Sequence, residues 1–330
     1  MIISQTPLRI SFVGGGTDQK EFWKNEKGAV LSSTIDKYIY VIVKKRFDEL
    51  IVVNYRLQEV VNCVSEIKHD LVRNCLKKVG ITSGIEITTL ADIPSEGSGL
   101  GSSSTVTVGL LNALYTYCSK QVTAEQLAQE ACEIEIDILG KPIGKQDQYI
   151  AAYGGLREIS FNPNGTVKIE SISNHNFPKL VFSSNLLLFY TNITRQSSDI
   201  LTIQKAEIKN KIDILRQMRD QVPHVRKVLE SEDNNDNVGI ILNKAWTLKK
   251  QLAKTISSPL IDEMYQKAID AGALGGKISG AGGGGFLLVY VQREKQNDVR
   301  QAMSDYMEFP FMFESDGSKI IFNITSNYWK

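Results

Sequence analysis

Residues 94–105 read P-S-E-G-S-G-L-G-S-S-S-T, a glycine-rich loop that runs into three serines. Glycine adopts positive φ at no steric cost, and serine hydroxyls often satisfy the free N–H groups of a helix start. The apolar spacing over residues 105–118 predicts the helix that follows. Its N–H groups and the positive end of its dipole would point at one place, which favours a phosphate site over a plain flexible turn. The residues expected to bind a phosphate-bearing cofactor are Pro94, Gly97, Gly99, Leu100, Gly101, Ser102, Ser103 and Ser104.

Length and composition are typical of a two-domain globular enzyme. The chain has 330 residues, of which 42% are hydrophobic and 23% are charged, and this length exceeds what a single core usually supports. We place the domain boundary between residues 174 and 185, which gives domains of residues 1–180 and 181–330. The net charge of +1 gives no reason to expect nucleic acid or a membrane as a partner, so the expected partners are small molecules. The oligomeric state does not follow from the sequence.

The cysteines and histidines predict neither a disulfide framework nor a zinc site. The four cysteines occur singly, without a C-x-x-C pair, and the three histidines are far apart in the sequence. The N-terminus lacks a basic segment followed by a long apolar core, and the apolar runs are much shorter than a membrane span. The expected location is therefore the reducing cytoplasm.

Residues 7–18 read P-L-R-I-S-F-V-G-G-G-T-D. The first seven alternate apolar and polar side chains, which predicts a strand, and the glycine run then makes a tight turn toward a short helical segment. Arg9, on the polar face of the strand, and Asp18, just beyond the turn, can therefore reach the same cleft. The alternative is an arginine on an exposed strand face, and the strand by itself leaves both interpretations open.

A second chemically suggestive segment, residues 135–148, reads E-I-D-I-L-G-K-P-I-G-K-Q-D-Q. Its glycines and its proline end the helix expected over residues 123–139, and Asp147 begins the next apolar segment. An aspartate at that point could serve simply as a helix cap.

Two segments of the second half also suggest ligand sites. Arg195, Ser197 and Ser198 precede an amphipathic helix and form a second candidate anion site, although Ser198 could serve only as the helix cap. Residues 275–285 read G-G-K-I-S-G-A-G-G-G-G, which contains G-x-G-x-x-G by count. This loop follows a helix and precedes a strand, the reverse of the order in a dinucleotide-binding fold, and no G-x-x-x-x-G-K-[ST] occurs. The Rossmann and P-loop classes are therefore excluded.

The remaining periodicity predicts an α+β fold. Pro223 is expected to end the long helix that begins near residue 199. Strands are expected over residues 7–13, 38–43, 50–55, 85–89, 186–190, 286–291 and 319–325, and helices over residues 66–79, 105–118, 123–139, 199–222, 238–255, 260–271 and 298–307.

Three of these segments resemble the motifs of the GHMP kinases, the superfamily of galactokinase, homoserine kinase, mevalonate kinase and phosphomevalonate kinase. The loop of residues 94–104 resembles the phosphate-binding motif, residues 7–18 the first motif and residues 277–285 the third. The resemblance covers nearly the whole chain. It implies a two-domain GHMP kinase fold, with an N-terminal ATP-binding domain like ribosomal protein S5 domain 2 and a ferredoxin-like C-terminal domain. The strands of residues 286–291 and 319–325 are expected to build that second domain.

The same resemblance implies ATP and Mg²⁺ as cofactors and assigns roles to several residues. Asp147 takes the position of the general base, and Arg9 that of the arginine that assists catalysis. Glu135 and Ser103 take the positions of the magnesium ligands, with Glu133 and Ser102 as alternatives. The residues expected around the substrate are Gly15, Gly16, Thr17, Asp18, Arg195, Ser197, Ser198, Gly280, Ala281, Gly282 and Gly283, with Lys145 in reserve as a phosphate ligand.

The turn after the first strand narrows the substrate. Galactokinases carry Gly-Glu-His-Thr-Asp at this place, whereas this chain has Gly-Gly-Gly-Thr-Asp, a form similar to that of bacterial D-glycero-D-manno-heptose 7-phosphate kinases. The expected reaction is therefore transfer of phosphate from ATP to the anomeric hydroxyl of that sugar phosphate. A fucokinase-like or other sugar 1-kinase and a non-catalytic sensor of the same fold are the alternatives. The presence of Arg9, Glu135 and Asp147 argues against the sensor, which needs no base.

Overall fold

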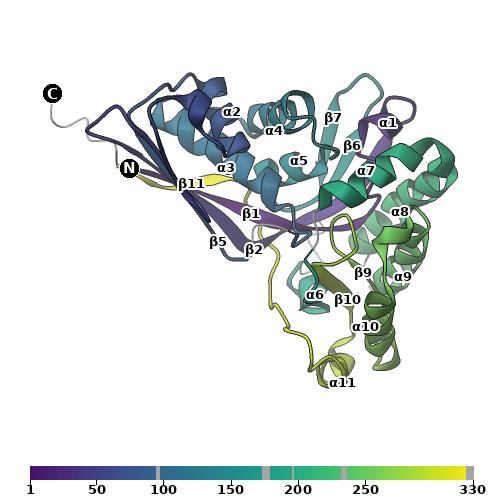
Figure 1. Cartoon of the computed structure of the whole chain (residues 1–330). Coiled ribbons are helices and arrows are strands. Elements are labelled where there is room, and N and C mark those ends of the chain that lie inside the picture. Colours follow the sequence, from purple (N-terminus) through teal and green to yellow (C-terminus); the bar gives the residue numbers. More distant parts are fainter. Residues whose placement is uncertain (94–96, 173–178, 195–196, 232–235, 325–330) are drawn as a thin grey trace.

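The computed structural model describes residues 1–93, 97–172, 179–194, 197–231 and 236–324. Two sheets of unequal size, flanked by helices, make up the fold (Figure 1). In the described part of the chain no helix is long and apolar enough to cross a membrane.

The large sheet is organised around a long antiparallel pair, β1 (Ile2–Val13) and β2 (Gly28–Lys45). The order is β11-β1-β2-β5-β3-β4, and the first half of β2 also pairs with β6, which pairs in turn with β7. The predicted strand of residues 38–43 is thus one part of a much longer strand. The other strands are β3 (Ile51–Asn54), β4 (Gln58–Val61), β5 (Ile85–Ala91), β6 (Leu156–Phe161), β7 (Val167–Ser171) and β11 (Lys319–Asn323).

Helices cover one face of the large sheet (Figure 1). They are α2 (Asp70–Val79), α3 (Ser102–Tyr117), α4 (Ala124–Cys132), the π-helix η2 (Glu133–Ile138) and α5 (Gln146–Tyr153), with the short α1 (Lys20–Trp23) and η1 (Val64–Glu66) in connections. Helix α3 is central, because it packs closely on both β1 and β2: a Cβ atom on Gly109 would lie 2.8 Å from the Thr6 hydroxyl and 3.3 Å from the Val41 side chain. This packing fixes the N-terminus of α3 relative to β1.

The small sheet has the order β8-β10-β9 and is antiparallel throughout. Its strands are β8 (Leu186–Tyr190), β9 (Gly275–Ile278) and β10 (Phe286–Tyr290). The helices and 3₁₀ turns of this part are α6 (Lys179–Ser184), α7 (Ser197–Glu207), η3 (Ile208–Lys211), α8 (Ile212–Glu230), α9 (Asp236–Lys250), η4 (Lys254–Ile256), α10 (Pro259–Asp270), η5 (Arg293–Lys295) and α11 (Gln296–Ala302).

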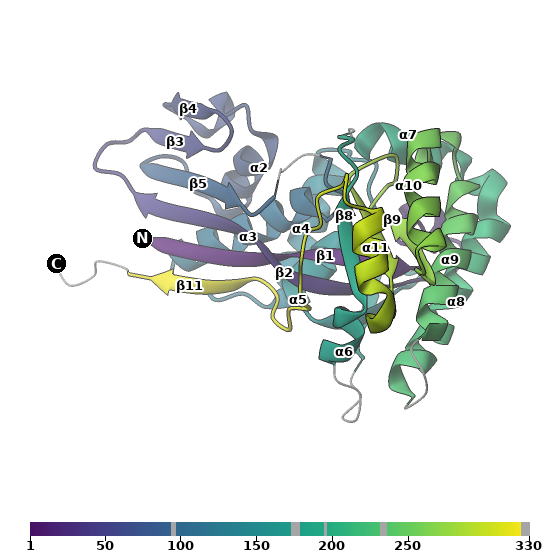
Figure 2. The ribbon, with the colours of Figure 1, turned by 90° about the horizontal axis from the view of Figure 1, so that it is seen from below.

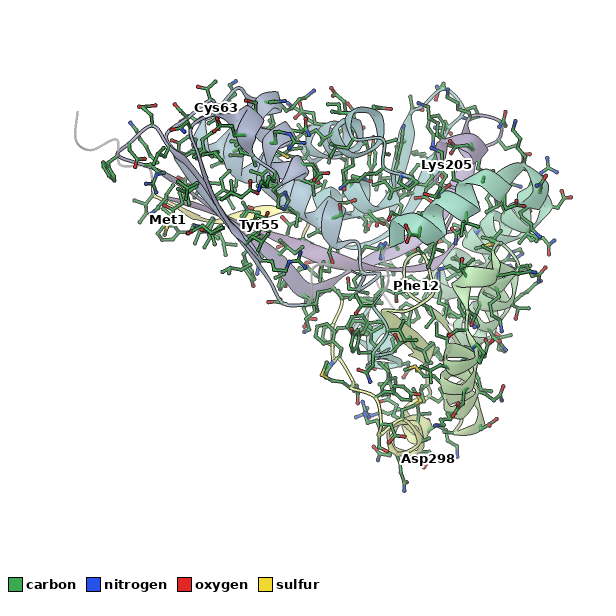
Figure 3. All side chains as sticks on the ribbon, in the orientation of Figure 1. Met1, Phe12, Tyr55, Cys63, Lys205 and Asp298 are labelled. Atoms are coloured by element: carbon green, nitrogen blue, oxygen red, sulfur yellow. The ribbon has the colours of Figure 1, made fainter. Side chains whose placement is uncertain are left out.

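The two sheets share a core at the end of β1. Phe12, labelled in Figure 3, has its ring 5.5 Å from that of Phe182 and 6.0 Å from that of Phe313. Val222 and Val225 of α8 belong to the same buried cluster. The strand that carries Arg9 is therefore held by apolar packing on both sides of the junction.

The expectation that the strand of residues 319–325 builds the second domain together with the strand of residues 286–291 is wrong. β11 pairs with β1, in a register that places Ile2 opposite Asn323 and Gln5 opposite Lys319. Figure 2 shows β11 beside β1, while α8, α9 and α10 lie toward the other end of the molecule. β10 already has β8 and β9 on its two edges, whereas β1 has an open edge that a strand can cover. The expected division at residue 180 stays a prediction, although the last described strand returns to the first sheet.

The expectation that Pro223 ends a helix is also wrong. The break falls instead at η3 (Ile208–Lys211), and Pro223 lies inside α8. Pro223 is exposed, while Val222 and Val225 on either side of it are buried. Because the missing hydrogen bond faces water and the flanking valines are held in the core, tertiary packing outweighs the local cost of proline.

Candidate active site

The glycine-rich loop has the backbone that its sequence predicts. Gly97, Gly99 and Gly101 have φ of +73°, +74° and +82°, and α3 begins at Ser102 directly after them. Such φ values strongly favour glycine. The loop therefore delivers the chain to the helix N-terminus through three left-handed residues. Pro94 lies outside the described residues.

A second glycine loop packs directly against this one. A Cβ atom on Gly99 would lie 2.6 Å from the carbonyl oxygen of Ser279, and one on Gly285 would lie 2.5 Å from the carbonyl oxygen of Ser98. The two loops thus meet backbone to backbone, with no room for side chains between them. The predicted residues of the second loop divide into two groups. Gly280 and Ala281 line a cavity, whereas Gly282 and Gly283 contact Ile256.

Arg9 and Asp147 form a two-pronged ion pair beside the first loop. The Nε and Nη2 atoms of Arg9 donate to the two carboxylate oxygens of Asp147 at 2.8 and 2.6 Å, and Nη1 donates to the carbonyl oxygen of Gly99 at 2.5 Å. A Cβ atom on Gly101 would lie within 3.4 Å of both side chains. Charged groups paired in this geometry are held firmly. The pair therefore sits where the glycine loop ends and the helix begins.

Glu135 and Ser103 meet on the other side of the helix start. The Ser103 hydroxyl donates to Oε1 of Glu135 at 2.6 Å, and the fully buried carboxylate also accepts from Nε2 of Gln148 at 2.8 Å. Lys141 donates to the same hydroxyl at 3.0 Å and lies 3.5 Å from Oε1 of Glu135. The π-helix that carries Glu135 replaces the regular helix expected there, and such turns are frequent at functional sites.

The alternative metal ligands, Glu133 and Ser102, make their contacts elsewhere. The Glu133 side chain is 47% exposed and binds Lys78 at 2.6 Å. Ser102 shares a hydrogen bond of 3.0 Å with Ser98. Ser104 is buried within the helix and does not contact Glu135 in any described hydrogen bond. Of the residues considered, Ser103 and Glu135 are the hydroxyl and the carboxylate that face each other.

A cavity of about 610 Å³, partly open to solvent, lies between the sheets at the Arg9–Asp147 pair. Gly15, Gly16 and Asp18 line it, as expected, whereas the Thr17 hydroxyl is buried in the turn and donates to backbone carbonyls. Asp18 accepts from the backbone N–H groups of Gly16 at 3.0 Å and Gln146 at 3.4 Å. Burial, followed by the charge of Asp147, raises the pKa of Asp18 to about 6. We call this space the acceptor cavity.

Several residues of the acceptor cavity were not predicted. Gln19, Gln146 and Gln204 supply amide groups, and Lys249 and Lys277 supply ammonium groups. Gln204 and Lys249 carry no signal in the sequence, because they occur in ordinary amphipathic segments. Gln19 directly follows Asp18, Gln146 precedes Asp147 in the segment of residues 135–148, and Lys277 belongs to the third motif, so their place beside predicted residues was the available signal.

The candidate anion site before α7 lies only partly within the described residues, so it stays a prediction. Arg195 lies outside the described residues, and nothing is described of the Ser197 side chain. Ser198 is exposed and interacts with Asp199 at 3.5 Å. α7 reaches the acceptor cavity instead through Leu201 and Gln204.

The reserve candidate, Lys145, points away from the acceptor cavity. Its Nζ atom lies 4.4 Å from the ring centre of Trp23 and donates to the carbonyl oxygen of Gly165 at 3.0 Å. These contacts satisfy the ammonium group within the first domain.

A second, larger cavity lies on the opposite side of the helix start, next to Ser102 and Ser103. Its lining is partly apolar and aromatic, from Tyr55, Leu71 and Val106 among others, and Lys141 lies at its inner end. Figure 3 labels Tyr55, whose ring lies 4.7 Å from that of His69 at this place. We call this space the nucleotide cavity. The glycine loop and the Arg9–Asp147 pair separate the two cavities.

This fold and site define a kinase with one ligand cavity on each side of a glycine loop, and comparison with known proteins agrees. The GHMP kinases N terminal domain matches residues 62–155, and the GHMP kinases C terminal domain matches residues 225–308. The D-glycero-alpha-D-manno-heptose 7-phosphate kinase of Campylobacter jejuni is 30% identical over 96% of this chain and 98% of its own length. The chain therefore belongs to the GHMP kinases and is an ATP-dependent sugar kinase.

Two further relatives have lower sequence identity. The bifunctional fucokinase/GDP-fucose pyrophosphorylase of Arabidopsis thaliana is 24% identical over 92% of this chain, which spans 31% of that protein. The crystal structure of a D-glycero-D-manno-heptose 1-phosphate kinase from Bacteroides thetaiotaomicron has a TM-score of 0.81 at 24% identity, covering 99% of this chain and 100% of its own. At that identity the likeness establishes the shared two-domain fold.

The contact between the two glycine loops predicts that Gly99→Ala and Gly80→Ala differ strongly in their KM for ATP. Both positions have positive φ, so both variants carry a similar backbone strain of about 1 kcal/mol. No atom lies within 4 Å of a Cβ at Gly80, whereas Gly99 faces the Ser279 carbonyl. We expect Gly99→Ala to raise the KM for ATP by about tenfold or more and Gly80→Ala to leave it unchanged, measured by steady-state kinetics. Equal effects would mean that the loop contact has no part in ATP binding.

The raised pKa of Asp18 predicts a pH effect on acceptor binding. Above about pH 6 Asp18 is ionised and would accept hydrogen bonds from the hydroxyls of a bound sugar, and below it the carboxyl gains a proton. The KM for the acceptor should therefore rise as the pH falls through 6. Asp18→Asn should raise this KM at pH 8 and flatten the dependence. A phosphate group on the acceptor also titrates near pH 6, but it does so equally with the wild-type enzyme and with Asp18→Asn. The difference between the two pH profiles of the KM therefore reports on Asp18 alone. Identical profiles would contradict this role.

Proposed function

We propose that this kinase transfers the γ-phosphoryl group of ATP to the anomeric hydroxyl of D-glycero-D-manno-heptose 7-phosphate. The observation that best supports this reaction is the position of the Arg9–Asp147 pair, at the boundary between the glycine loop and a cavity lined by polar groups. The substrate is inferred from the relative in Campylobacter jejuni, which matches nearly the whole chain.

ATP would bind with its base in the nucleotide cavity and its phosphates along the glycine loop. The apolar and aromatic lining suits a purine ring, and the N-terminus of α3 suits phosphate. In this arrangement the γ-phosphate reaches past Ser103 toward Asp147. The loop itself then forms the bridge between the two substrates.

Asp147 would take the proton of the attacking hydroxyl, as the general base. Its Oδ1 and Oδ2 atoms are held by Arg9, so the carboxylate has one fixed orientation beside the acceptor cavity. Arg9, with the N–H groups at the start of α3, would offset the negative charge on the transferring group. Positioning and charge together account for the chemistry.

Mg²⁺ fits the residues on the nucleotide side. Ser103 and Glu135 supply one hydroxyl and one buried carboxylate, the small set of protein ligands that Mg²⁺ takes when phosphates provide the rest. Lys141, which contacts both groups, occupies a cationic position between them. No cluster of three or more metal-binding side chains occurs in the described residues, in keeping with a metal that arrives with the nucleotide. When bound, the ion supplies charge neutralisation to the phosphates.

Sugar hydroxyls would bind to Asp18 and to the amides that face the acceptor cavity. The Oε1 atom of Gln19 is buried without a partner in the described structure, so it is available to accept a hydroxyl. A buried acceptor left unpaired costs free energy, which a bound hydroxyl would recover.

Activity with a panel of acceptors tests the assignment. ATP turnover would be measured with D-glycero-D-manno-heptose 7-phosphate, the free heptose, L-fucose, D-galactose and mevalonate, with the product position read by NMR. The highest kcat/KM is expected for the heptose phosphate, with the new phosphate on the anomeric oxygen. L-fucose as the best substrate would instead support the fucokinase alternative, which the relatives with fucokinase activity in their names favour.

The role of Asp147 predicts that Asp147→Asn lowers kcat by about 10²- to 10⁴-fold while the KM for ATP stays near the wild-type value. Asp137→Asn is the matched control, because Asp137 belongs to the same segment but has a largely exposed side chain that pairs with Lys20. The control should retain full activity. An Asp147→Asn enzyme with near wild-type kcat would remove this residue from the role of base.

The proposed metal site predicts different effects of Glu135→Gln and Glu133→Gln. Glu135→Gln should raise the Mg²⁺ concentration needed for half-maximal activity by about tenfold and lower kcat, because it removes the carboxylate charge. Glu133→Gln should do neither, since Glu133 binds Lys78 at the surface. The opposite result would place the metal at Glu133.

A further inference from the structure

Two buried lysines line the acceptor cavity, and the proposed chemistry uses neither. Lys249, near the end of α9, and Lys277, in β9, are 6% and 4% exposed. Lys277 donates to the carbonyl oxygen of Phe12 at 3.0 Å. Lys249 donates to the carbonyl oxygens of Ile278, at 3.3 Å, and Gly280. Both lysines are therefore anchored by backbone atoms at the meeting point of the sheets.

Neither ammonium group is neutralised by a carboxylate in the described part of the chain. The acidic groups of the cavity are Asp147, which is paired with Arg9, and Asp18, which is held by backbone N–H groups. Burial, followed by the charge of Arg9, lowers the pKa of Lys277 to about 7. Burial, followed by the charges of Lys277 and Arg9, lowers the pKa of Lys249 well below its usual value. Lysine is almost never fully buried unless it is paired. The two lysines at this end of the cavity therefore lack a counter-ion in the described part of the chain.

We propose that Lys249 and Lys277 bind the phosphate group that the acceptor sugar already carries. This inference rests on the proposed function and names the residues that select a phosphorylated acceptor. An ammonium group has three N–H donors, of which Lys277 uses one and Lys249 two on backbone carbonyls. The remaining donors are available to phosphate oxygens. A dianion between the lysines would offset both charges, whereas an unphosphorylated sugar would leave them unpaired.

The position of the lysines assigns the phosphate to the acceptor and not to ATP. Both line the acceptor cavity, and neither lines the nucleotide cavity, where Lys141 is the basic group at the helix start. Arg9, which is bound to Asp147 and to the glycine loop, lines the same cavity as the lysines. A sugar with its anomeric hydroxyl at Asp147 can therefore direct its far end toward the lysines.

Charge-neutral substitutions test the proposal. Lys277→Gln and Lys249→Gln keep an N–H donor for the backbone carbonyl and remove the charge. Each should raise the KM for heptose 7-phosphate by about 10- to 100-fold and narrow the preference over free heptose by at least tenfold, while the KM for ATP changes less than twofold. Lys277→Arg should retain most of the preference. Lys250→Gln is the matched control, because Lys250 follows Lys249 but binds the exposed Asp262.

Several results would overturn the proposal. One is an unchanged preference in both glutamine variants, and another is a rise in the KM for ATP alone, which would place the lysines at the γ-phosphate. Loss of the preference in Arg195→Ala but not in the lysine variants would place the phosphate before α7. If wild-type enzyme prefers heptose 7-phosphate and the variants keep that preference, the inference fails and the proposed function stands. If wild-type enzyme does not use heptose 7-phosphate, the proposed function itself fails.

A measurement on the wild-type enzyme covers the case in which the glutamine variants do not fold, which thermal unfolding would reveal. Inorganic phosphate should inhibit competitively against the sugar phosphate and not against ATP. Competition against ATP alone, or no inhibition at concentrations well above the KM of the sugar phosphate, would contradict an anion site at the lysines.

Discussion

The ion pair between Arg9 and Asp147 is the contact on which the rest of the site depends. Through it β1, the glycine loop and the start of α5 are held at one point, since Arg9 also donates to the Gly99 carbonyl. Phe12, three residues further along β1, packs against Phe182 in the core that the two sheets share, and this packing also holds the strand. The base role proposed for Asp147 requires an orientation that is set before the substrate arrives, and this arrangement sets the orientation with rigid elements.

A second constraint is the backbone contact between the two glycine loops. A Cβ atom on Gly280 would lie 2.7 Å from the Cα atom of Gly99, and one on Gly285 would lie 2.5 Å from the carbonyl oxygen of Ser98. The first glycine loop is therefore shaped by the second loop as well as by α3. Gly280 and Ala281 of the second loop also line the acceptor cavity, so a displacement of the first loop would disturb one wall of that cavity.

Charged side chains are distributed unevenly on the two sides of the glycine loop. On the nucleotide side Lys141 lies between a hydroxyl and a buried carboxylate, whereas on the acceptor side two lysines have only backbone oxygens as partners. Buried charge without a counter-ion reduces stability, and functional sites are where proteins commonly retain it. In this site the cost appears as the depressed pKa values of Lys249 and Lys277, which a bound anion would raise again.

The sequence by itself determined the fold class, the family and the local backbone of the glycine loop, because these depend on periodicity and on residues such as Gly99 whose conformation is a local property. It could not separate Glu135 from Glu133, since the choice depends on which turn of a π-helix faces Ser103. Tertiary structure decided the place of β11, because β1 has an open edge with which that strand can pair. Tertiary structure also decided that α8 continues through Pro223, because the neighbouring valines are held in the core. Only folding brings Lys249 and Lys277 into one cavity, because they lie 28 positions apart in the sequence. The sequence also does not show which of its lysines are buried, since burial is a property of the tertiary structure.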